Sequence, residues 1–313
     1  MKLGRNIIKL KGDASTRIFF RKKKSNASSI IVYAYKDKKL NLLIYDAINK
    51  IFIMNDILAP KLLSENYSKN YIEIEDFGNQ TIFDLFQKKK VNKFIIFKKI
   101  IKLLNKIQLI HTKKIKGIRN FVYKVPKYNS KILYKETKIF VDWYIDQKLS
   151  KIRKKKFEKE FLKITKNLIK KINLKNDTFV HRDFHISNIM IFDKKIGVID
   201  TQDALIGNKA YDLASLVDDV RFETSNIMKK KILNYYLKSQ RNLNKDHFIN
   251  DFEIISILRN FKIIGIFTRL ALRDNKRKYL KLIPYAWKLI KLRSRKNNKF
   301  AKLNNLLETL KKK

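Results

Sequence analysis

Residues 179–200 read FVHRDFHISNIMIFDKKIGVID and hold the most informative spacing of polar residues in the chain. Asp183 follows His181 and Arg182 and precedes Asn188 by five positions. This spacing matches the H-R-D-x-x-x-x-N loop, in which the aspartate orients an acceptor hydroxyl and the asparagine binds a metal ion. Asp200 ends the apolar run 196–199, where a second metal ligand is expected. The stretch therefore predicts phosphoryl transfer.

The residue types in this stretch suit that chemistry. Catalysis of phosphoryl transfer rests on positioning and on neutralising charge at the phosphates. Asp183 is suited to take the proton of the acceptor, while Asn188 and Asp200 offer hard oxygen ligands for Mg²⁺ that bridges the phosphates of ATP. The alternative is a metal cluster of His181, Asp183 and His185. The other two histidines are distant in sequence.

Composition limits the class of protein. The 313 residues are 45% hydrophobic, so the chain can bury a sizeable core, and seven glycines and three prolines argue against a disordered or fibrous protein. The absence of cysteine excludes disulfides, thiolate metal sites and a cysteine nucleophile. The first residues lack the apolar core of a signal peptide, and no stretch reaches the ~20 apolar residues of a membrane span. We therefore expect a cytoplasmic protein without membrane insertion.

The net charge of +45, from 73 Lys and Arg against 28 Asp and Glu, has two interpretations. A strong positive field attracts nucleic acid, anionic lipid and phosphorylated ligands. However, the lysines occur in short clusters along the whole chain, with no recognisable nucleic-acid-binding motif around them. Lysine, isoleucine and asparagine also have codons rich in A and T, so skewed base composition alone produces such a chain. No specific nucleic-acid partner is predicted.

Hydrophobic periodicity separates a β-rich beginning from a helical remainder. The runs that predict strands are 6–10, 18–20, 29–35, 61–63 and 71–74. Residues 41–56 repeat apolar residues at helical spacing and predict a helix packed on that sheet. Long amphipathic patterns predict helices over 91–110, 131–149, 157–172 and most of the chain from 227. Short β runs at 189–192 and 196–199 are expected to bracket the catalytic loop, so the sequence predicts an α+β fold.

Two features concern the phosphates of ATP. The segment 12–16, GDAST, lies between two predicted strands, and its backbone N–H groups are suited to cover phosphates, although a simple hairpin turn is the alternative. Many kinases hold the α- and β-phosphates with a lysine on the third strand. Residues 32–35, VYAY, contain none. We therefore expect another cation, Arg17 or Arg21, to face the phosphates.

Residues 179–221 resemble the aminoglycoside phosphotransferase-like kinases, specifically the bacterial anomeric kinases for N-acetylmuramate and N-acetylglucosamine. The segments 12–21, 74–78 (IEDFG), 140–144 and 259–284 are also similar to segments of that family, so the resemblance covers most of the chain. It implies a two-lobed protein-kinase-like fold. The expected lobes are a small β-rich N-lobe, 1–78, with a hinge at 75–78, and a larger, mostly α-helical C-lobe, 79–313.

The resemblance also implies roles for individual residues. The residues implied to bind ATP are Gly12, Asp13, Ala14, Ser15, Arg17, Glu75, Asp76 and Phe77. By the same resemblance, Asp183 is the catalytic base, and Asn188 and Asp200 bind Mg²⁺. The implied reaction moves phosphate from ATP to the C1 hydroxyl of an amino sugar, giving a sugar 1-phosphate for cell-wall recycling. An anomeric hydroxyl is more acidic than an ordinary sugar hydroxyl, so a carboxylate base assists it more readily.

The acceptor is the least determined part of this hypothesis. Asp203, Asp142 and Arg221 are candidate residues for binding it, and Asp203 has the alternative role of stabilising a turn. Alternative acceptors are an aminoglycoside, a choline-like or a homoserine-like alcohol. The positive charge disfavours a cationic aminoglycoside and favours anionic N-acetylmuramate. A nucleic-acid-binding protein on a kinase-like scaffold is the alternative outside enzymes, and the sequence predicts no oligomeric state.

Overall fold

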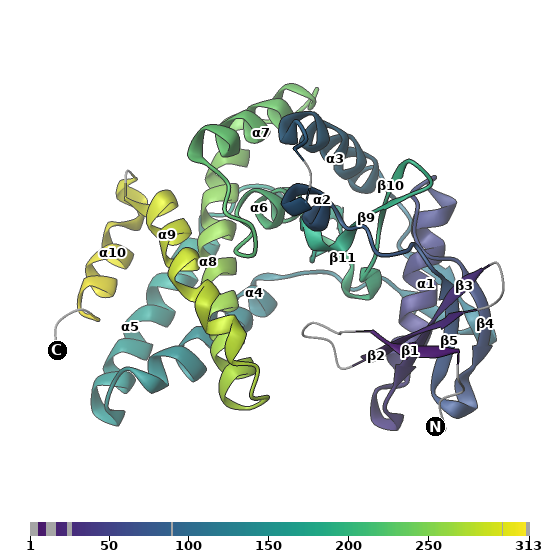
Figure 1. Ribbon diagram of the computed structural model, residues 1–313. Coiled ribbons are helices and arrows are strands. Elements are labelled where there is room, and N and C mark those ends of the chain that lie inside the picture. Colours follow the sequence, from purple (N-terminus) through teal and green to yellow (C-terminus); the bar gives the residue numbers. More distant parts are fainter. Residues whose placement is uncertain (1–5, 11–16, 24–26, 89, 296, 311–313) are drawn as a thin grey trace. The chain divides into compact units, whose positions relative to one another are not determined.

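Figure 1 shows the computed structural model, which describes residues 6–10, 17–23, 27–88, 90–295 and 297–310. The chain divides into two compact units, each described by itself. Unit 1 comprises Met1–Pro126 and Phe179–Ile206, and unit 2 comprises Lys127–Thr178 and Gly207–Lys313. Each of these units is built from two segments of the chain, whereas each expected lobe is one continuous segment. The lobe boundary at residue 78 stays a prediction.

Unit 1 combines strands with a few helices. Its strands are β1 (Ile7–Lys9), β2 (Arg17–Lys23), β3 (Ser28–Ala34), β4 (Leu62–Asn66), β5 (Tyr71–Glu75), β6 (Lys114–Lys116), β7 (Val122–Lys124), β9 (Ile189–Phe192) and β10 (Lys195–Val198), and its helices are α1 (Leu40–Met54), α2 (Ile82–Lys88) and α3 (Lys93–Gln108). The chain passes between the units after Pro126, and again within β8 (Asn176–Val180) and within β11 (Leu205–Asn208).

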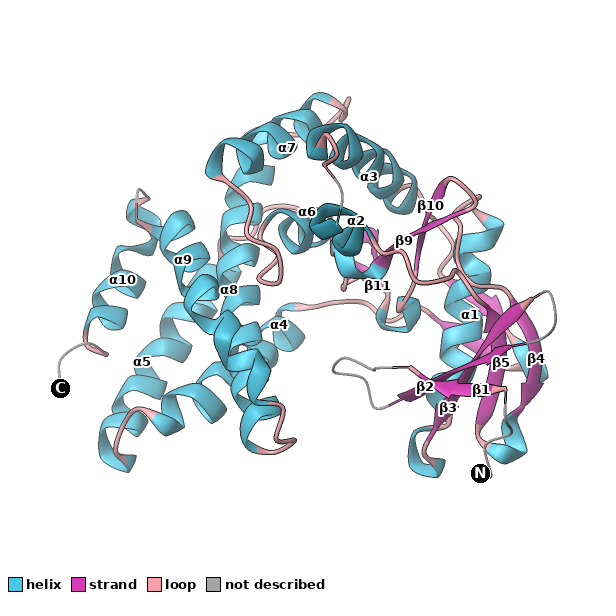
Figure 2. Ribbon diagram, in the orientation of Figure 1, coloured by secondary structure: helices cyan, strands magenta, loops and turns pink. Residues whose placement is uncertain are grey.

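The first five strands form an antiparallel sheet in the order β1-β2-β3-β5-β4 (Figure 2). Alternate residues of a strand point to the same face, so Ile30, Val32 and Ala34 of β3 share one face of the sheet. They pack there with Leu42 and Tyr45 of α1 in one buried cluster. The five predicted strands and the predicted helix over 41–56 are therefore confirmed.

Two hairpins complete unit 1. The two predicted β runs are confirmed as the strands β9 and β10, which pair antiparallel. Both strands follow the catalytic loop, so the expectation that they bracket it is wrong. β6 and β7 also pair antiparallel, with Ile115 opposite Tyr123, but the sequence pattern did not indicate them. Each has three residues and begins or ends with exposed side chains, so it lacks the longer alternation from which strands are predicted.

Unit 2 is helical. Its helices are α4 (Ser130–Ile139), α5 (Lys151–Lys170), α6 (Ala210–Val217), α7 (Asn226–Lys238), α8 (Lys245–Leu272), α9 (Ile283–Ser294) and α10 (Ala301–Glu308). A turn of π-helix, Phe140–Tyr144, extends α4. Asparagine or serine side chains cap several helix starts; Asn244, for example, accepts a hydrogen bond from the His247 N–H at 2.9 Å.

α8 is the central helix of unit 2, and it carries buried residues around most of its circumference. Gly265 lets the backbone of the preceding segment approach closely, because a Cβ there would lie 2.4 Å from the carbonyl oxygen of Ile139. Trp287 of α9 packs near the same place, against Phe140 and Phe261. Among the described residues, no helix has the combination of length and apolar character that a membrane crossing needs.

Candidate active site

The catalytic-loop motif lies in unit 1, between β8 and β9. The side-chain amide of Asn188 donates from Nδ2 to the backbone carbonyl of Asp183 at 3.1 Å, which closes the loop on itself. Arg182 has a φ of 75° and Asp200 a φ of 61°. Residues other than glycine pay a conformational cost in this left-handed region, and such residues concentrate at functional sites.

The two predicted metal ligands lie next to each other. In the β9–β10 hairpin, Val198 is paired with Ile189. The pairing continues by one further hydrogen bond, in which the Ile199 N–H donates to the Asn188 carbonyl at 3.0 Å. Asp200 is the next residue, so the hairpin places its backbone beside that of Asn188. Because the Asn188 Nδ2 is held by the Asp183 carbonyl, the Oδ1 of this amide is the atom suited to a metal ion.

Electrostatics at Asp200 suit a bound cation. Burial raises the pKa of Asp200, and the negative charges of Asp183 and Asp203 raise it further, while Arg17 opposes them. The charges of Asp183 and Asp203 therefore disfavour ionised Asp200, and a bound divalent cation would offset this effect. An amide oxygen and a carboxylate also fit Mg²⁺, which binds through few protein ligands and completes its shell with phosphate and water. The residues present thus fit the metal that the motif implies.

Arg17 supplies a cation at this site. It begins β2 directly opposite Ala34 of β3, and residues opposite each other in a sheet share a face. Its Nη2 lies 2.9 Å from Oδ1 of Asp200, and its side chain is 6% exposed. Arg17 thus places a buried cation beside Asp200, on the strand next to the one that carries the lysine in many kinases.

Helix α1 holds Arg17 and the turn after Asp200 in place. The guanidinium of Arg17 lies 5.5 Å from the ring centre of Tyr45. Burial raises the pKa of Tyr45 to about 12, so its ring stays neutral. One turn further along α1, Asn49 accepts a hydrogen bond from the Thr201 hydroxyl and donates to the Pro60 carbonyl at 2.9 Å. Tyr45 and Asn49 were missed from the sequence, because in an apolar helical pattern they look like ordinary core residues.

Arg21, the other candidate cation, has a different role. Its Nη2 lies 2.9 Å from Oδ1 of Asp76, and its Nε contacts the second carboxylate oxygen. The same carboxylate accepts hydrogen bonds from the Ser28 hydroxyl at 2.7 Å and the Gly78 N–H at 2.8 Å. Burial opposes ionisation, but these contacts outweigh it and lower the pKa of Asp76. The Asp76 side chain thus holds the 75–78 segment to the sheet.

Two residues flank Asp76 in the predicted hinge. The Glu75 N–H donates to the Lys61 carbonyl at 2.9 Å, as part of the sheet edge. The Phe77 ring is buried and stacks on Phe192 of β9, with ring centres 4.7 Å apart. These contacts fix the segment without testing whether it binds adenine. The predicted phosphate-covering residues Gly12, Asp13, Ala14 and Ser15 lie outside the described residues.

The histidines of the motif have packing roles. His181 is fully buried against Phe52 and Phe184, and burial lowers its pKa to about 4, so it is neutral at pH 7. His185 is 5% exposed. No group of three or more histidines and carboxylates that could hold a metal occurs in the part of the chain that the structure describes. The alternative of a metal cluster centred on His181, Asp183 and His185 is therefore not supported.

The three candidate acceptor residues fall in different places. Asp203 is in unit 1, where it lies 3.3 Å from Arg182 and accepts a hydrogen bond from Gln202 at 2.8 Å. Its side chain is 48% exposed. Asp142, in the π-helical turn of unit 2, forms an ion pair with Lys138. Arg221 is also in unit 2, with its Nη1 3.7 Å from Oδ1 of Asp219. The structure does not test their contact with an acceptor.

Comparison with known proteins agrees with this site. The family model described as "Phosphotransferase enzyme family" matches residues 98–245, which include the catalytic loop and Asp200. The N-acetylmuramate/N-acetylglucosamine kinase of Neisseria meningitidis is 27% identical over 307 residues, covering 95% of this chain and 88% of that protein. The chain is therefore similar, over most of its length, to kinases of the aminoglycoside phosphotransferase-like family.

Two further comparisons also match along most of the chain. The protein of the same name from Pseudomonas aeruginosa is 24% identical over 310 residues, covering 97% of this chain and 88% of the relative. The gentamicin complex of APH(2")-IIa matches with a TM-score of 0.65 at 12% identity, covering 91% of this kinase and 93% of that chain. At this identity the likeness concerns the fold, and it confirms the predicted protein-kinase-like α+β class.

Proposed function

We propose that this kinase transfers the γ-phosphate of ATP to the C1 hydroxyl of an N-acetylated amino sugar, N-acetylmuramate or N-acetylglucosamine. The names of the relatives that match along nearly the whole chain support this acceptor class. The observation that carries the proposal is the pairing of Asn188 with the strand end that bears Asp200, beside the loop of Asp183. The product, a sugar 1-phosphate, fits cell-wall recycling, and the use of ATP fits a cytoplasmic location.

Each side chain has a defined part in this proposal. Asp183 orients the C1 hydroxyl and accepts its proton. Asn188 and Asp200 would hold Mg²⁺, which neutralises charge on the phosphates when bound. Arg17 would donate to the phosphates in place of Asp200 when nucleotide is bound, since a guanidinium pairs with phosphate as well as with carboxylate. The backbone of the hinge, Glu75–Phe77, would bind adenine.

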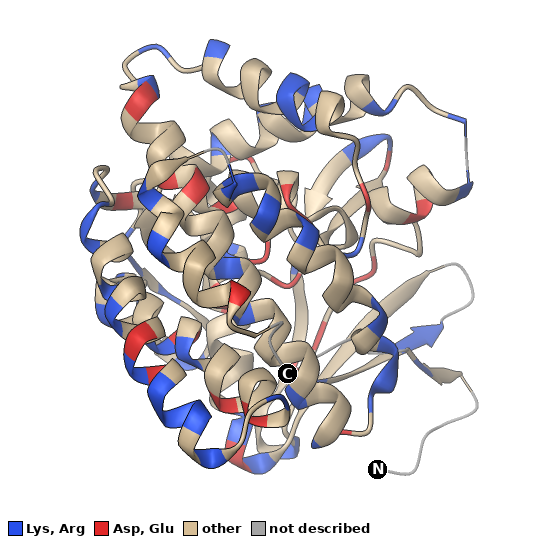
Figure 3. Cartoon of the chain, turned by 90° about the vertical axis from the view of Figure 1, so that its left-hand side faces the viewer, with Lys and Arg blue, Asp and Glu red and all other residues tan. Residues whose placement is uncertain are grey.

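Charge supports a sugar acceptor over a cationic one. A chain with a net charge of +45 repels a polycationic aminoglycoside during approach and attracts the carboxylate of N-acetylmuramate. Figure 3 shows Lys and Arg on many of the elements that it draws, so these residues are not confined to one helix. Such a distribution favours solvated helix faces over a dedicated nucleic-acid interface.

Kinetics with single variants test the assigned roles. We expect Asp183→Asn to lower kcat by about 10²–10⁴-fold while ATP affinity changes little, because only proton transfer and acceptor orientation are lost. Asp200→Asn should weaken Mg²⁺-dependent ATP binding by about 10–100-fold, the range for a lost metal ligand or its support. Asp193→Asn is the matched control, since it removes the same charge in the exposed β9–β10 turn. Normal turnover by Asp183→Asn contradicts its role as base.

The acceptor is tested separately by measuring ADP release with a panel of alcohols. We expect release with N-acetylmuramate and N-acetylglucosamine and none with an aminoglycoside or choline. If only choline or an aminoglycoside causes ADP release, kinase activity is supported and a sugar acceptor is contradicted. ATP binding without release for any alcohol rejects the proposed acceptor class.

A further inference from the structure

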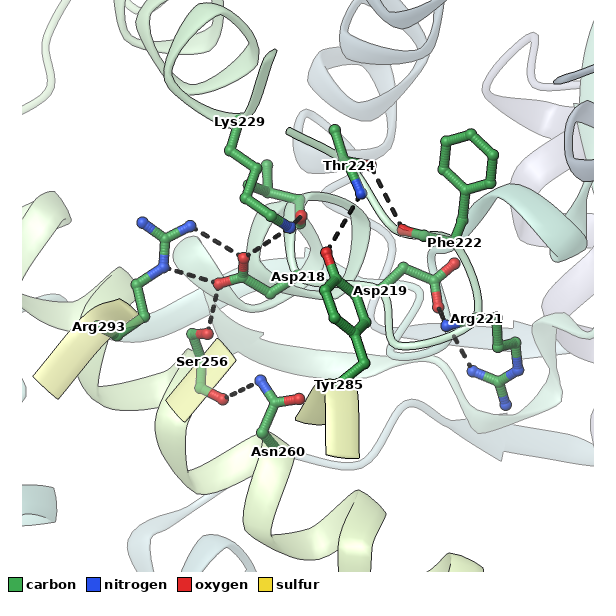
Figure 4. Close-up of polar contacts among 11 residues, drawn as sticks. Asp218, Asp219, Arg221, Phe222, Thr224, Lys229, Ser256, Asn260, Tyr285 and Arg293 are labelled. Atoms are coloured by element: carbon green, nitrogen blue, oxygen red, sulfur yellow. Dashed lines mark hydrogen bonds and ion pairs between the residues drawn. The ribbon is translucent and has the colours of Figure 1, made fainter. Parts of the chain in front are cut away.

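Two consecutive aspartates of unit 2 have opposite environments. Asp218 and Asp219 follow α6 and are both buried, with 0% and 4% exposure. Asp218 is fully engaged: Arg293 donates to both its oxygens at 2.8 and 2.9 Å, the Ser256 hydroxyl donates at 2.6 Å, and Lys229 lies at 3.2 Å. Figure 4 shows these three side chains converging on one carboxylate. Asp218 therefore anchors the segment after α6 to helices α7, α8 and α9.

Asp219 has far fewer contacts. Its Oδ1 accepts a hydrogen bond from the Arg221 N–H at 3.0 Å, and the Arg221 side chain lies 3.7 Å away. Its Oδ2 is buried and has no hydrogen-bond partner in the described part of the chain. The pKa values differ accordingly: burial raises the pKa of Asp219, whereas the charges of Arg293 and Lys229 overcome burial and lower the pKa of Asp218. A buried carboxylate oxygen without a donor is costly, so its retention calls for an explanation.

A second buried side chain, on α8, has a polar atom without a hydrogen-bond partner among the described residues. Asn260 is 1% exposed, and its Nδ2 donates to the Ser256 carbonyl at 2.8 Å, but its Oδ1 has no partner among the described residues. Ser256, Asn260 and Phe267 are four and seven residues apart, so they share one face of α8. Asp218 contacts that face at Ser256, and Arg221 packs over Phe267 at 5.8 Å. Asp219 lies between Asp218 and Arg221 in the chain, and Asn260 lies one turn from Ser256 on that face of α8.

Two guanidinium groups, those of Arg221 and Arg259, act on Asp219. Arg259 precedes Asn260 on α8 and is 6% exposed. It lies 5.9 Å from the ring of Tyr211, and no hydrogen bond or carboxylate contact within 4 Å engages it among the described residues. Its charge and that of Arg221 both act on Asp219. Lys229, which pairs with Asp218, also acts on Asp219, so three cations together oppose the effect of burial on this carboxylate.

We propose that Asp219, Arg221, Arg259 and Asn260 form the acceptor subsite of unit 2, and that the two arginines select a monoanionic amino sugar. This inference rests on the proposed function. The open oxygens of Asp219 and Asn260 accept from hydroxyl or acetamido N–H groups, which N-acetylmuramate and N-acetylglucosamine share. The arginines donate to the lactyl carboxylate, which only N-acetylmuramate carries. Of the earlier candidates, the subsite keeps Arg221 and adds three residues.

The decisive experiment compares KM and kcat for the two sugars in one set of variants. We expect Arg259→Gln to raise KM for N-acetylmuramate by about 10–100-fold, the effect of one lost charge-assisted hydrogen bond. KM for N-acetylglucosamine should change by less than about threefold, since it has no carboxylate. Arg259→Lys should recover part of the loss. Asp219→Asn should raise KM for both sugars, because it acts on shared groups.

Controls separate recognition from folding. Arg273→Gln removes a cation from the exposed end of the same helix and should leave both KM values unchanged. Arg221→Gln, at a side chain that is 21% exposed, repeats the selectivity test at a less buried position. ATP affinity and the thermal midpoint should match wild type in every variant used. Equal loss for the two sugars in Arg259→Gln and Arg221→Gln, or no loss for either, overturns the proposal.

Calorimetry distinguishes this inference from the proposed function. N-acetylmuramate should bind the wild-type kinase more tightly than N-acetylglucosamine, and Arg259→Gln should remove that difference. If the sugars bind with this preference but neither is phosphorylated, the subsite stands and the proposed reaction fails. If both are phosphorylated but selectivity is unaltered by the arginine variants, the reaction stands and the subsite fails. If neither sugar binds, both fail.

Discussion

The buried His181 should make folding stability depend on pH in a defined window. Its folded-state pKa is about 4, against 6.5 for an exposed histidine, and the cause is burial. Between these values the unfolded chain binds a proton that the folded chain does not, so stability is complete above pH 6.5 and decreases as the pH falls toward 4. Lowering the pH from 7.5 to 4.5 should remove about 2.5 kcal/mol of unfolding free energy through this residue.

The perturbation is His181→Gln, which keeps a neutral polar side chain at every pH. It costs some stability through lost packing against Phe52 and Phe184, but that cost is the same at both pH values. The assay is urea unfolding followed by circular dichroism at pH 7.5 and 4.5, for wild type and variant. Other titrating groups, such as Asp200 with its raised pKa, contribute equally to both proteins and cancel in the comparison.

The expected result is that the stability loss on acidification is about 2.5 kcal/mol smaller in the variant. His111→Gln is the control, because His111 is exposed and belongs to the same unit. It should leave the pH dependence as in wild type. Equal losses in wild type and His181→Gln would refute the burial of a neutral imidazole in the catalytic loop.

Other expected outcomes follow from single contacts. Arg17→Met should raise KM for ATP by about 10–100-fold, the effect of a lost charge-assisted contact, and Arg17→Lys should recover part of it; unchanged KM removes Arg17 from the phosphates. Asp76→Asn should destabilise the protein by about 3 kcal/mol in urea unfolding, because Arg21 loses its buried partner. Gly265→Ala should destabilise by about 2 kcal/mol, since its Cβ would meet the Ile139 carbonyl; helix propensity alone gives the opposite sign.

Much of the site could be predicted because its residues are close in sequence. Asp183, Asn188 and Asp200 lie within 18 positions on a loop and a hairpin, so spacing and a short β pattern suffice to bring Asn188 and Asp200 together. The first sheet could be predicted for a similar reason, since each strand carries its own alternation or β-rich run.

The choice between Arg17 and Arg21 needed the structure. Both arginines belong to β2, and four residues separate them, so they point to the same face and the sequence treats them alike. Strand register and the position of α1 place Arg17 at Asp200, whereas Arg21 meets the Asp76 carboxylate at the other end of the strand. Such pairing depends on contacts between residues far apart in the chain.

The residues of the proposed unit 2 subsite were harder to predict from the sequence than those of the candidate active site. Arg259 and Asn260 interrupt a mostly apolar helix. Such an interruption is only a weak indication that buried polar residues bind a ligand. Nothing in the local pattern indicates that the charge of Arg259 acts on Asp219, 40 residues earlier, or that Asp218 pairs with Arg293. The contrast between the two aspartates became visible only from their partners.

The central claim is transfer of phosphate to the anomeric hydroxyl of an amino sugar, and ¹H–³¹P correlation NMR of the reaction product tests it most directly. With ATP, Mg²⁺ and N-acetylmuramate or N-acetylglucosamine, a new phosphorus resonance should correlate with the anomeric proton H1. Asp183→Asn should give no such resonance in the same time. A correlation to H6 or another ring position, or ADP release without a sugar phosphate, would contradict the claim.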